Sequence, residues 1–133
     1  MKKDEWGEWP NFSYAEMSCK ETGANDMKVS FMDSLQRLRH VCGFPFVVSS
    51  GYRSLLHSVE KAKKSPGAHT LGKAVDILVS GEEAFRLLSL AMPSDSGFFG
   101  VGIAQRGPHD KRFIHLDGLI DEEGFPRPFV WSY

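Results

Sequence analysis

Two segments of the chain repeat apolar residues at the spacing of a helix. The first, residues 27–42, carries a stripe formed by Phe31, Leu35, Leu38 and Cys42. The second, residues 82–92, carries a stripe formed by Ala84, Leu87, Leu88 and Ala91. Residues that recur every three or four positions share one face of a helix. The pattern therefore predicts two main helices, with Asn25 or Asp26 capping the first and Gly43 ending it.

Short β-branched or apolar runs predict strands elsewhere in the chain. Residues 45–51, 74–79 and 112–117 are such runs, and the tail ends in a further strand that contains Trp131. Residues 98–104 are interrupted by glycines, which predicts a strand with a bulge. Because helices and strands mix without a strict βαβ alternation, we predict an α+β fold with an antiparallel sheet.

Length and composition fit one small domain. The chain has 133 residues, of which 41% are hydrophobic and 25% are charged, and its formal net charge is -1. This length suits a single core. We therefore predict one domain over residues 1–133, in which residues 1–10 form an arm that packs by its tryptophans. The charge argues against nucleic acid as a partner, because a basic face would be expected there.

Two further observations concern the compartment. The N-terminal segment has two lysines but no apolar region after them, so we do not expect a signal peptide, and no apolar run reaches the ~20 residues of a membrane span. Cys19 and Cys42 are expected to be two buried thiols, because two cysteines do not make a disulfide framework. We expect synthesis in the cytoplasm.

Two imidazoles and a carboxylate are the candidate catalytic chemistry. His69 and Asp76 lie in HTLGKAVD, and His115 lies in the apolar run FIHLD. A histidine alone in an apolar run is more often a core residue than a ligand, so His115 gains weight only from the other two. Asp76 falls within an apolar strand, where an unpaired charge is costly. Two histidines and one aspartate suit a catalytic zinc ion that keeps its fourth position for water.

Three motifs together resemble a known peptidase family. SGYRS, SPGAHTLGKAVDI and FIHLD follow one another in this order. They are similar to motifs of the zinc D-Ala-D-Ala carboxypeptidases and endolysin peptidases of family M15, most of all its short subgroup. NFSYAEMSCKETG and RPFVWSY are similar as well, so the resemblance covers nearly the whole chain. It implies a Hedgehog/DD-peptidase-like fold, Zn²⁺ bound by His69, Asp76 and His115, and Arg53 as the residue that contacts the substrate and stabilises the oxyanion.

Asp117 has two interpretations. It matches the acidic residue that lies two positions past the last ligand in this subgroup. On a strand, the side chains of His115 and Asp117 point to the same face. Asp117 is then either the general base or an acceptor that orients a ligand imidazole. His57 and His109 are the other candidates for the base.

The chain departs from the family pattern at three positions. Many members have Glu or Asp three residues before the last histidine as the general base, and this chain has Arg112 there. The subgroup often has Ser at the position of Gly67 and Asn at the position of His57. An arginine cannot accept a proton, so the base must come from elsewhere in the chain.

The resemblance implies a zinc peptidase that hydrolyses an amide bond in the peptidoglycan stem peptide. The bond is either the terminal D-Ala-D-Ala bond or an internal one, such as L-Ala-D-Glu. Small size, no signal peptide and no wall-binding domain favour a phage or prophage lytic enzyme, a monomer that reaches the cell wall after the membrane is breached. The alternatives are a non-catalytic zinc-binding module that recognises peptides and a metal-free structural domain with buried histidines.

Overall fold

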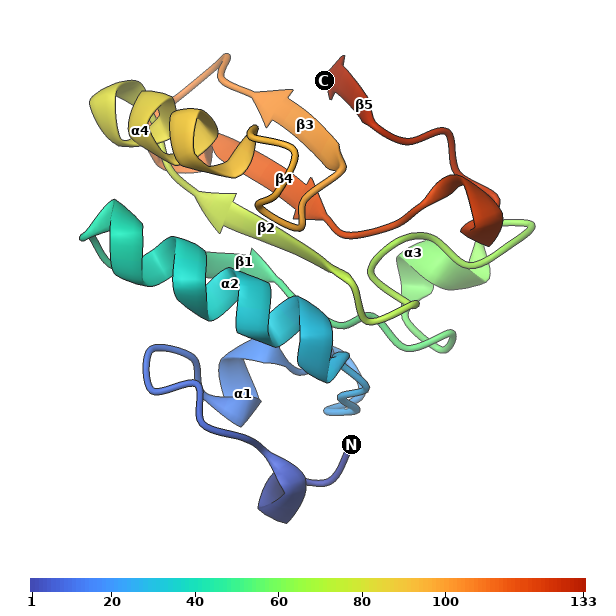
Figure 1. The fold of residues 1–133 in the computed structure, drawn as a ribbon. Coiled ribbons are helices and arrows are strands. Elements are labelled where there is room, and N and C mark those ends of the chain that lie inside the picture. The colour runs from blue at the N-terminus through green and yellow to red at the C-terminus, as the bar shows by residue number, and fades with distance from the viewer.

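Five strands form one sheet in the computed structural model, which covers residues 1–133. The strands are β1 (Val47–Ser50), β2 (Ala74–Leu78), β3 (Gly100–Ala104), β4 (Phe113–Asp117) and β5 (Phe129–Ser132). Their order across the sheet is β1-β2-β4-β3-β5 (Figure 1). Neighbouring strands are antiparallel except for β3 and β5, which are parallel. The predicted α+β fold with a mostly antiparallel sheet is confirmed.

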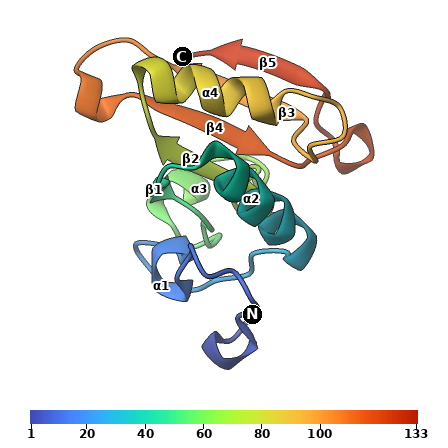
Figure 2. The ribbon, with the colours of Figure 1, turned by 60° about the vertical axis from the view of Figure 1, so that its left-hand side comes forward.

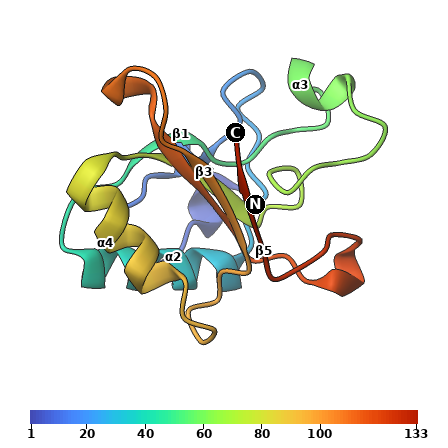
Figure 3. The same cartoon turned by 90° about the horizontal axis from the view of Figure 1, so that it is seen from above.

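Four helices accompany the sheet. They are α1 (Tyr14–Met17), α2 (Val29–Cys42), α3 (Ser58–Lys61) and α4 (Gly81–Ala91). The two long helices, α2 and α4, lie side by side on one face of the sheet (Figure 1, Figure 2). In the view from above, α3 and the loops around it lie on the other side (Figure 3). None of the helices has both the length and the apolar character needed to cross a bilayer.

Strand alternation divides the residues of β2 and β4 between the two faces. The residues that enter the core together with the inner faces of α2 and α4 are Val75, Ile77, Ile114 and Leu116, all 0% exposed. Burial of each such side chain contributes about 1.5–3 kcal/mol relative to leaving it in water. Because successive side chains of a strand point to opposite faces, Asp76, His115 and Asp117 lie on the face away from α2 and α4.

Both predicted helices form. The predicted stripe of α2 is buried throughout, and Gly43 ends this helix with a φ of 76°. The predicted start is wrong, because neither Asn25 nor Asp26 caps α2. The side chain of Asn25 instead accepts a hydrogen bond from the Met27 backbone N–H at 3.0 Å, which closes a turn before the helix begins. In α4 the predicted stripe is buried except for Leu88, which is half-buried.

The glycines of β3 do not produce the predicted bulge. This strand pairs with β4 in continuous register, and the irregularity of the sheet lies in β1 instead, between Val48 and Ser50. The glycines make room for a side chain from the neighbouring strand, since a Cβ on Gly102 would lie 2.8 Å from the indole of Trp131. A glycine in a strand can mark such a close approach as well as a bulge.

Residues 1–10 pack against the core through their aromatic rings. Trp9 is buried, and its indole N–H donates to a carboxylate oxygen of Asp33 on α2 at 2.9 Å. The rings of Trp6 and Trp9 meet edge to face with centroids 4.8 Å apart. Cys19 and Cys42 are both buried and unbridged, as predicted.

Candidate metal centre

The sheet register brings two of the three candidate ligands together. Asp76 on β2 lies directly opposite His115 on β4, and both side chains point to the same face. His69 comes from the loop before β2. Each of the three residues offers one ligand atom, and these atoms all lie within 4.8 Å of one another. The carboxylate oxygen Oδ1 of Asp76 is 2.9 Å from His115 Nδ1 and 3.4 Å from His69 Nε2.

Hydrogen bonds fix the direction of both imidazole rings. Nδ1 of His69 lies 2.8 Å from the backbone oxygen of Gly51, to which it donates, so Nε2 is the nitrogen that faces Asp76. Nε2 of His115 lies 2.8 Å from Oδ2 of Asp117, so Nδ1 is the nitrogen that faces Asp76. A metal-binding histidine almost always has its second nitrogen tied to a carbonyl or a carboxylate in this way. The donor set therefore fits a metal ion that takes two imidazoles and one carboxylate.

Asp117 is held in place from behind. Nε and Nη2 of Arg127 donate to its two oxygens at 2.9 and 2.8 Å, and the side chain of Asp117 is 0% exposed. Burial raises the pKa of Asp117, but the hydrogen bonds from His115 and Arg127 outweigh it and lower this pKa to about 2. Asp117 is thus an ionised acceptor that faces His115 and not the open space in front of the ligands.

The same hydrogen bonds set the charge of the other two groups. Burial raises the pKa of Asp76, but the hydrogen bonds from His115 and His69 outweigh it and keep this pKa well below its usual range. Burial lowers the pKa of His115, whereas its hydrogen bonds to Asp117 and Asp76 raise it, and the net shift is upward. Two carboxylates around one imidazole thus favour a positive charge at this spot. A bound metal ion supplies that charge while both imidazoles stay neutral.

Glycines on β3 open the sheet beside His115. Gly100 lies opposite Asp117 and Gly102 opposite His115. A Cβ on Gly100 would collide with the Asp117 carboxylate and with Arg127. Without a side chain at Gly102, Trp131 reaches across β3, and the ring centroids of His115 and Trp131 are 5.1 Å apart.

A cleft of about 390 Å³ lies in front of the three ligand atoms. Its aromatic wall consists of Phe113, Phe125, Trp131 and Tyr133. Its cationic side chains are Arg53, Lys63 and Arg127. Asp76 is the one carboxylate that lines it. A cleft with aromatic and cationic walls beside a metal centre suits a peptide segment that carries carboxylate groups.

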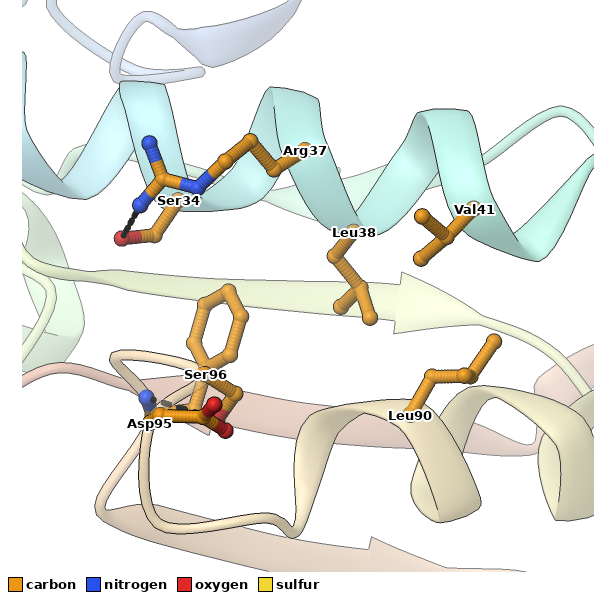
Figure 4. Close-up of a pocket in the computed structure, with 8 residues that line it drawn as sticks. Ser34, Arg37, Leu38, Val41, Leu90, Asp95 and Ser96 are labelled. Carbon is orange, nitrogen blue, oxygen red and sulfur yellow. Dashed lines mark hydrogen bonds between the residues drawn. The ribbon is translucent and has the colours of Figure 1, made fainter.

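The other face of the molecule holds a smaller hollow between α2 and α4 (Figure 4). Its volume is about 140 Å³, and Leu38 and Val41 of α2 face Leu90 of α4 across it. Arg37 points away from this apolar part and donates to the hydroxyl of Ser34. No histidine or cysteine lines this hollow, so it offers no imidazole of the kind that lines the cleft.

The cleft takes in most of the predicted site residues. His69, Asp76, His115 and Arg53 all line it. Asp117 contacts His115 but lies behind it.

The two histidines considered as bases lie elsewhere. His57 caps α3 and pairs with Glu21 at 3.1 Å, and His109 lies in the exposed turn between β3 and β4. Neither lines the cleft. Arg112, at the position of the missing acid, donates to the backbone oxygen of Gly107.

Two functional residues were not predicted. Arg127 holds Asp117 from a segment ten residues away, and Glu60 binds Arg53 at 3.5 Å and Lys63 at 2.8 Å. The only signal in the sequence is that a buried Asp117 needs a cation from somewhere in the chain.

Comparison with known protein families places the chain in a peptidase group. A family model described as Peptidase M15 matches residues 10–117, a range that includes His69, Asp76, His115 and Asp117 but ends before Arg127. No curated protein matches the chain.

Proposed function

Because the chain belongs to the peptidase M15 family, which indicates a metallopeptidase, we propose that it is a zinc-dependent peptidase that hydrolyses an amide bond of the peptidoglycan stem peptide. One observation carries this proposal. The three free ligand atoms converge within 4.8 Å, and the second nitrogen of each imidazole is tied to a fixed acceptor. A purely structural pair of buried histidines has no need of this arrangement.

Zinc at this centre would lower the pKa of a bound water to about 7 and polarise the amide carbonyl. The remaining roles belong to side chains of this chain. His69 and His115 present one neutral nitrogen each, and Asp117 holds His115 in the required tautomer. Arg53, which lines the same cleft, donates to the oxyanion of the tetrahedral intermediate.

The substrate is proposed at two levels. The cleft beside the ligands is open enough for a peptide and has cationic and aromatic walls, which suits a short peptide with carboxylate groups. Within the stem peptide, the scissile bond is the terminal D-Ala-D-Ala bond or an internal bond such as L-Ala-D-Glu. A role in phage or prophage lysis, as a monomer acting on the cell wall, is part of the same proposal.

A second candidate function is a zinc-binding module that recognises peptides without cleaving them. The observation that favours it is the absence of a free carboxylate beside the metal ligands. Asp76, itself a proposed ligand, is the only carboxylate that lines the cleft. Asp117 is bound by His115 and Arg127. Both candidates bind zinc, but only the first releases new amino groups from peptidoglycan.

A digest of purified peptidoglycan with the zinc-loaded protein, analysed by mass spectrometry, tests the proposal. The control is the variant His69→Ala. We expect fragments that name the scissile bond and that disappear in the variant. If the folded, zinc-loaded protein yields no fragments from walls with different stem peptides, the peptidase proposal is wrong and the binding module takes its place.

A further inference from the structure

A buried carboxylate lies next to the cleft but outside the metal centre. The side chain of Glu60 on α3 is 0% exposed, although the short helix that carries it is at the surface. Its Oε1 accepts hydrogen bonds from the Gly67 backbone N–H at 3.0 Å and from the Thr70 hydroxyl at 2.9 Å. These two bonds tie α3 to the loop that carries His69.

The second oxygen of Glu60 is shared by two cations that line the cleft. Oε2 lies 2.8 Å from Lys63 Nζ and 3.5 Å from Arg53 Nη1. The side chains of Lys63 and Arg53 are 40% and 22% exposed, so both can still meet a ligand. One carboxylate between two cations leaves one positive charge without a partner in the cluster. That excess charge faces the cleft, where it can be balanced by an anionic group of a bound molecule.

Gly67 makes room for the ammonium group of Lys63. A Cβ at this position would lie 2.7 Å from Lys63 Nζ and 3.5 Å from Glu60 Oε1. Lys63 therefore crosses the space that any other side chain at position 67 would fill, two residues before the ligand His69. The ammonium is held at the wall of the cleft by Glu60 on one side and by the bare backbone of Gly67 on the other.

We infer that Lys63 is a specificity-determining residue that binds a carboxylate of the substrate beside the metal centre, with Glu60 as the positioning residue for Lys63 and Arg53. The inference rests on the proposed function and names a substrate class for it, a peptide with a free carboxylate next to the scissile bond. Two sources offer this chemistry in a stem peptide. One is the C-terminal carboxylate of a D-Ala-D-Ala end, and the other is the α-carboxylate of a D-glutamyl residue.

Matched peptide pairs distinguish these sources. The first pair is an acetylated peptide that ends in D-Ala-D-Ala, as the free acid and as the C-terminal amide. The second is an L-Ala-D-Glu stem peptide and its analogue with the glutamyl α-carboxylate converted to an amide. For each peptide, kcat/KM is measured where cleavage occurs and Kd by titration calorimetry where it does not. If nothing is cleaved, the peptidase proposal fails, but the Kd values still test Lys63.

For the pair that the site recognises, we expect Lys63→Met to lower kcat/KM for the acid, or to raise its Kd, roughly 10- to 100-fold, as for a lost charge-assisted hydrogen bond. The same constant for the amide should change by less than about twofold, since the amide lacks the charge that Lys63 attracts. Lys63→Arg should retain the preference for the acid. The matched control is Lys61→Met, because Lys61 ends α3 two residues before Lys63, is exposed, and does not line the cleft.

Gly67→Ala provides an independent test that removes no charge. The added Cβ displaces only the mobile end of Lys63, so the protein should still fold and should lose the same preference for the acid. The inference is overturned if Lys63→Met weakens the recognition of acid and amide equally. It is also overturned if neither variant changes the ratio of kcat/KM or Kd between the acid and the amide.

Discussion

At the scale of single residues, the direction of His115 depends on a carboxylate that is itself clamped. Two nitrogens of Arg127 hold both oxygens of Asp117, and one of these oxygens faces His115 Nε2. The variant Asp117→Asn keeps the shape but removes the charge and turns one acceptor into a donor. We expect zinc affinity to fall roughly 10- to 100-fold, measured by competition with a chromophoric chelator.

The control for this prediction is Asp110→Asn. Asp110 is an exposed aspartate in the turn before β4, so its loss should leave zinc affinity unchanged. Unchanged affinity in a folded Asp117→Asn variant would mean that His115 keeps its direction without this carboxylate. The role of Asp117 as an orienting acceptor would then be wrong.

The sequence predicts which residues the fold brings together better than it predicts their surroundings. His69, Asp76 and His115 follow from motifs whose residue types suit zinc, and the cleft does bring them together. The nitrogen that each ring leaves free depends on Gly51 and on the Asp117–Arg127 pair. These contacts join segments that are distant along the chain, and no local pattern encodes them. The choice between the two interpretations of Asp117 therefore depends on contacts that the sequence does not show.

At the scale of elements, the glycines of β3 govern how close β5 lies to the metal centre. In Gly102→Ala, the new Cβ would meet Trp131 at 2.8 Å and Tyr133 at 2.9 Å, so both rings must shift from their present positions. We expect a loss of about 1–3 kcal/mol in the free energy of unfolding, as for other overpacked sites. Urea denaturation followed by tryptophan fluorescence measures it.

A double variant identifies the source of that loss. If Trp131 is the main obstacle, Gly102→Ala should cost less in a Trp131→Ala background than in the wild type, because the two changes share one contact. Equal costs in the two backgrounds would show that the strand itself, and not its contact with β5, requires glycine at this position.

Elements with strong periodicity were predictable, and their pairing was not. The stripes of α2 and α4 follow from apolar residues at helical spacing, and both are buried apart from Leu88. The strand order β1-β2-β4-β3-β5 depends on which faces meet across the sheet, and short strands carry little of that information. The glycines of β3 indicated a bulge because a glycine within a strand marks either a bulge or the close approach of another group.

At the scale of the whole molecule, the contacts of Glu60 beside the cleft should make the free energy of unfolding depend on pH in the acid range. Burial raises its pKa, but the hydrogen bonds from Lys63, Gly67 and Thr70 outweigh it and lower this pKa to about 2, from 4.5. A carboxylate with a lowered pKa in the folded state contributes stability above its unfolded pKa and loses it as the pH falls toward the folded value. This contribution, about 3 kcal/mol, should therefore be complete above pH 4.5 and should decline toward pH 2.

The variant Glu60→Gln should remove that dependence. Its stability loss should be full at neutral pH and should shrink as the pH falls toward 2, where the wild-type carboxylate is itself becoming neutral. Urea unfolding across this pH range measures the difference, and the exposed Glu8→Gln serves as the control. A constant difference at all pH values would mean that Glu60 acts through packing and not through its charge.

The proposed zinc ion should also stabilise the entire fold, because its ligands come from the loop before β2, from β2 and from β4, and converge only in the folded chain. Zinc at about 100 times its Kd adds about 2.7 kcal/mol, which for a domain of this size raises the melting temperature by roughly 10 °C. A chelator should reverse the gain, and His69→Ala should show none.

The gain from zinc should also depend on pH. Protons compete with zinc for His115, whose pKa is raised, so the gain should shrink as the pH falls. A melting temperature that responds to neither zinc nor chelator at neutral pH would favour a metal-free structural domain in which Asp76 is balanced by protonated imidazole alone.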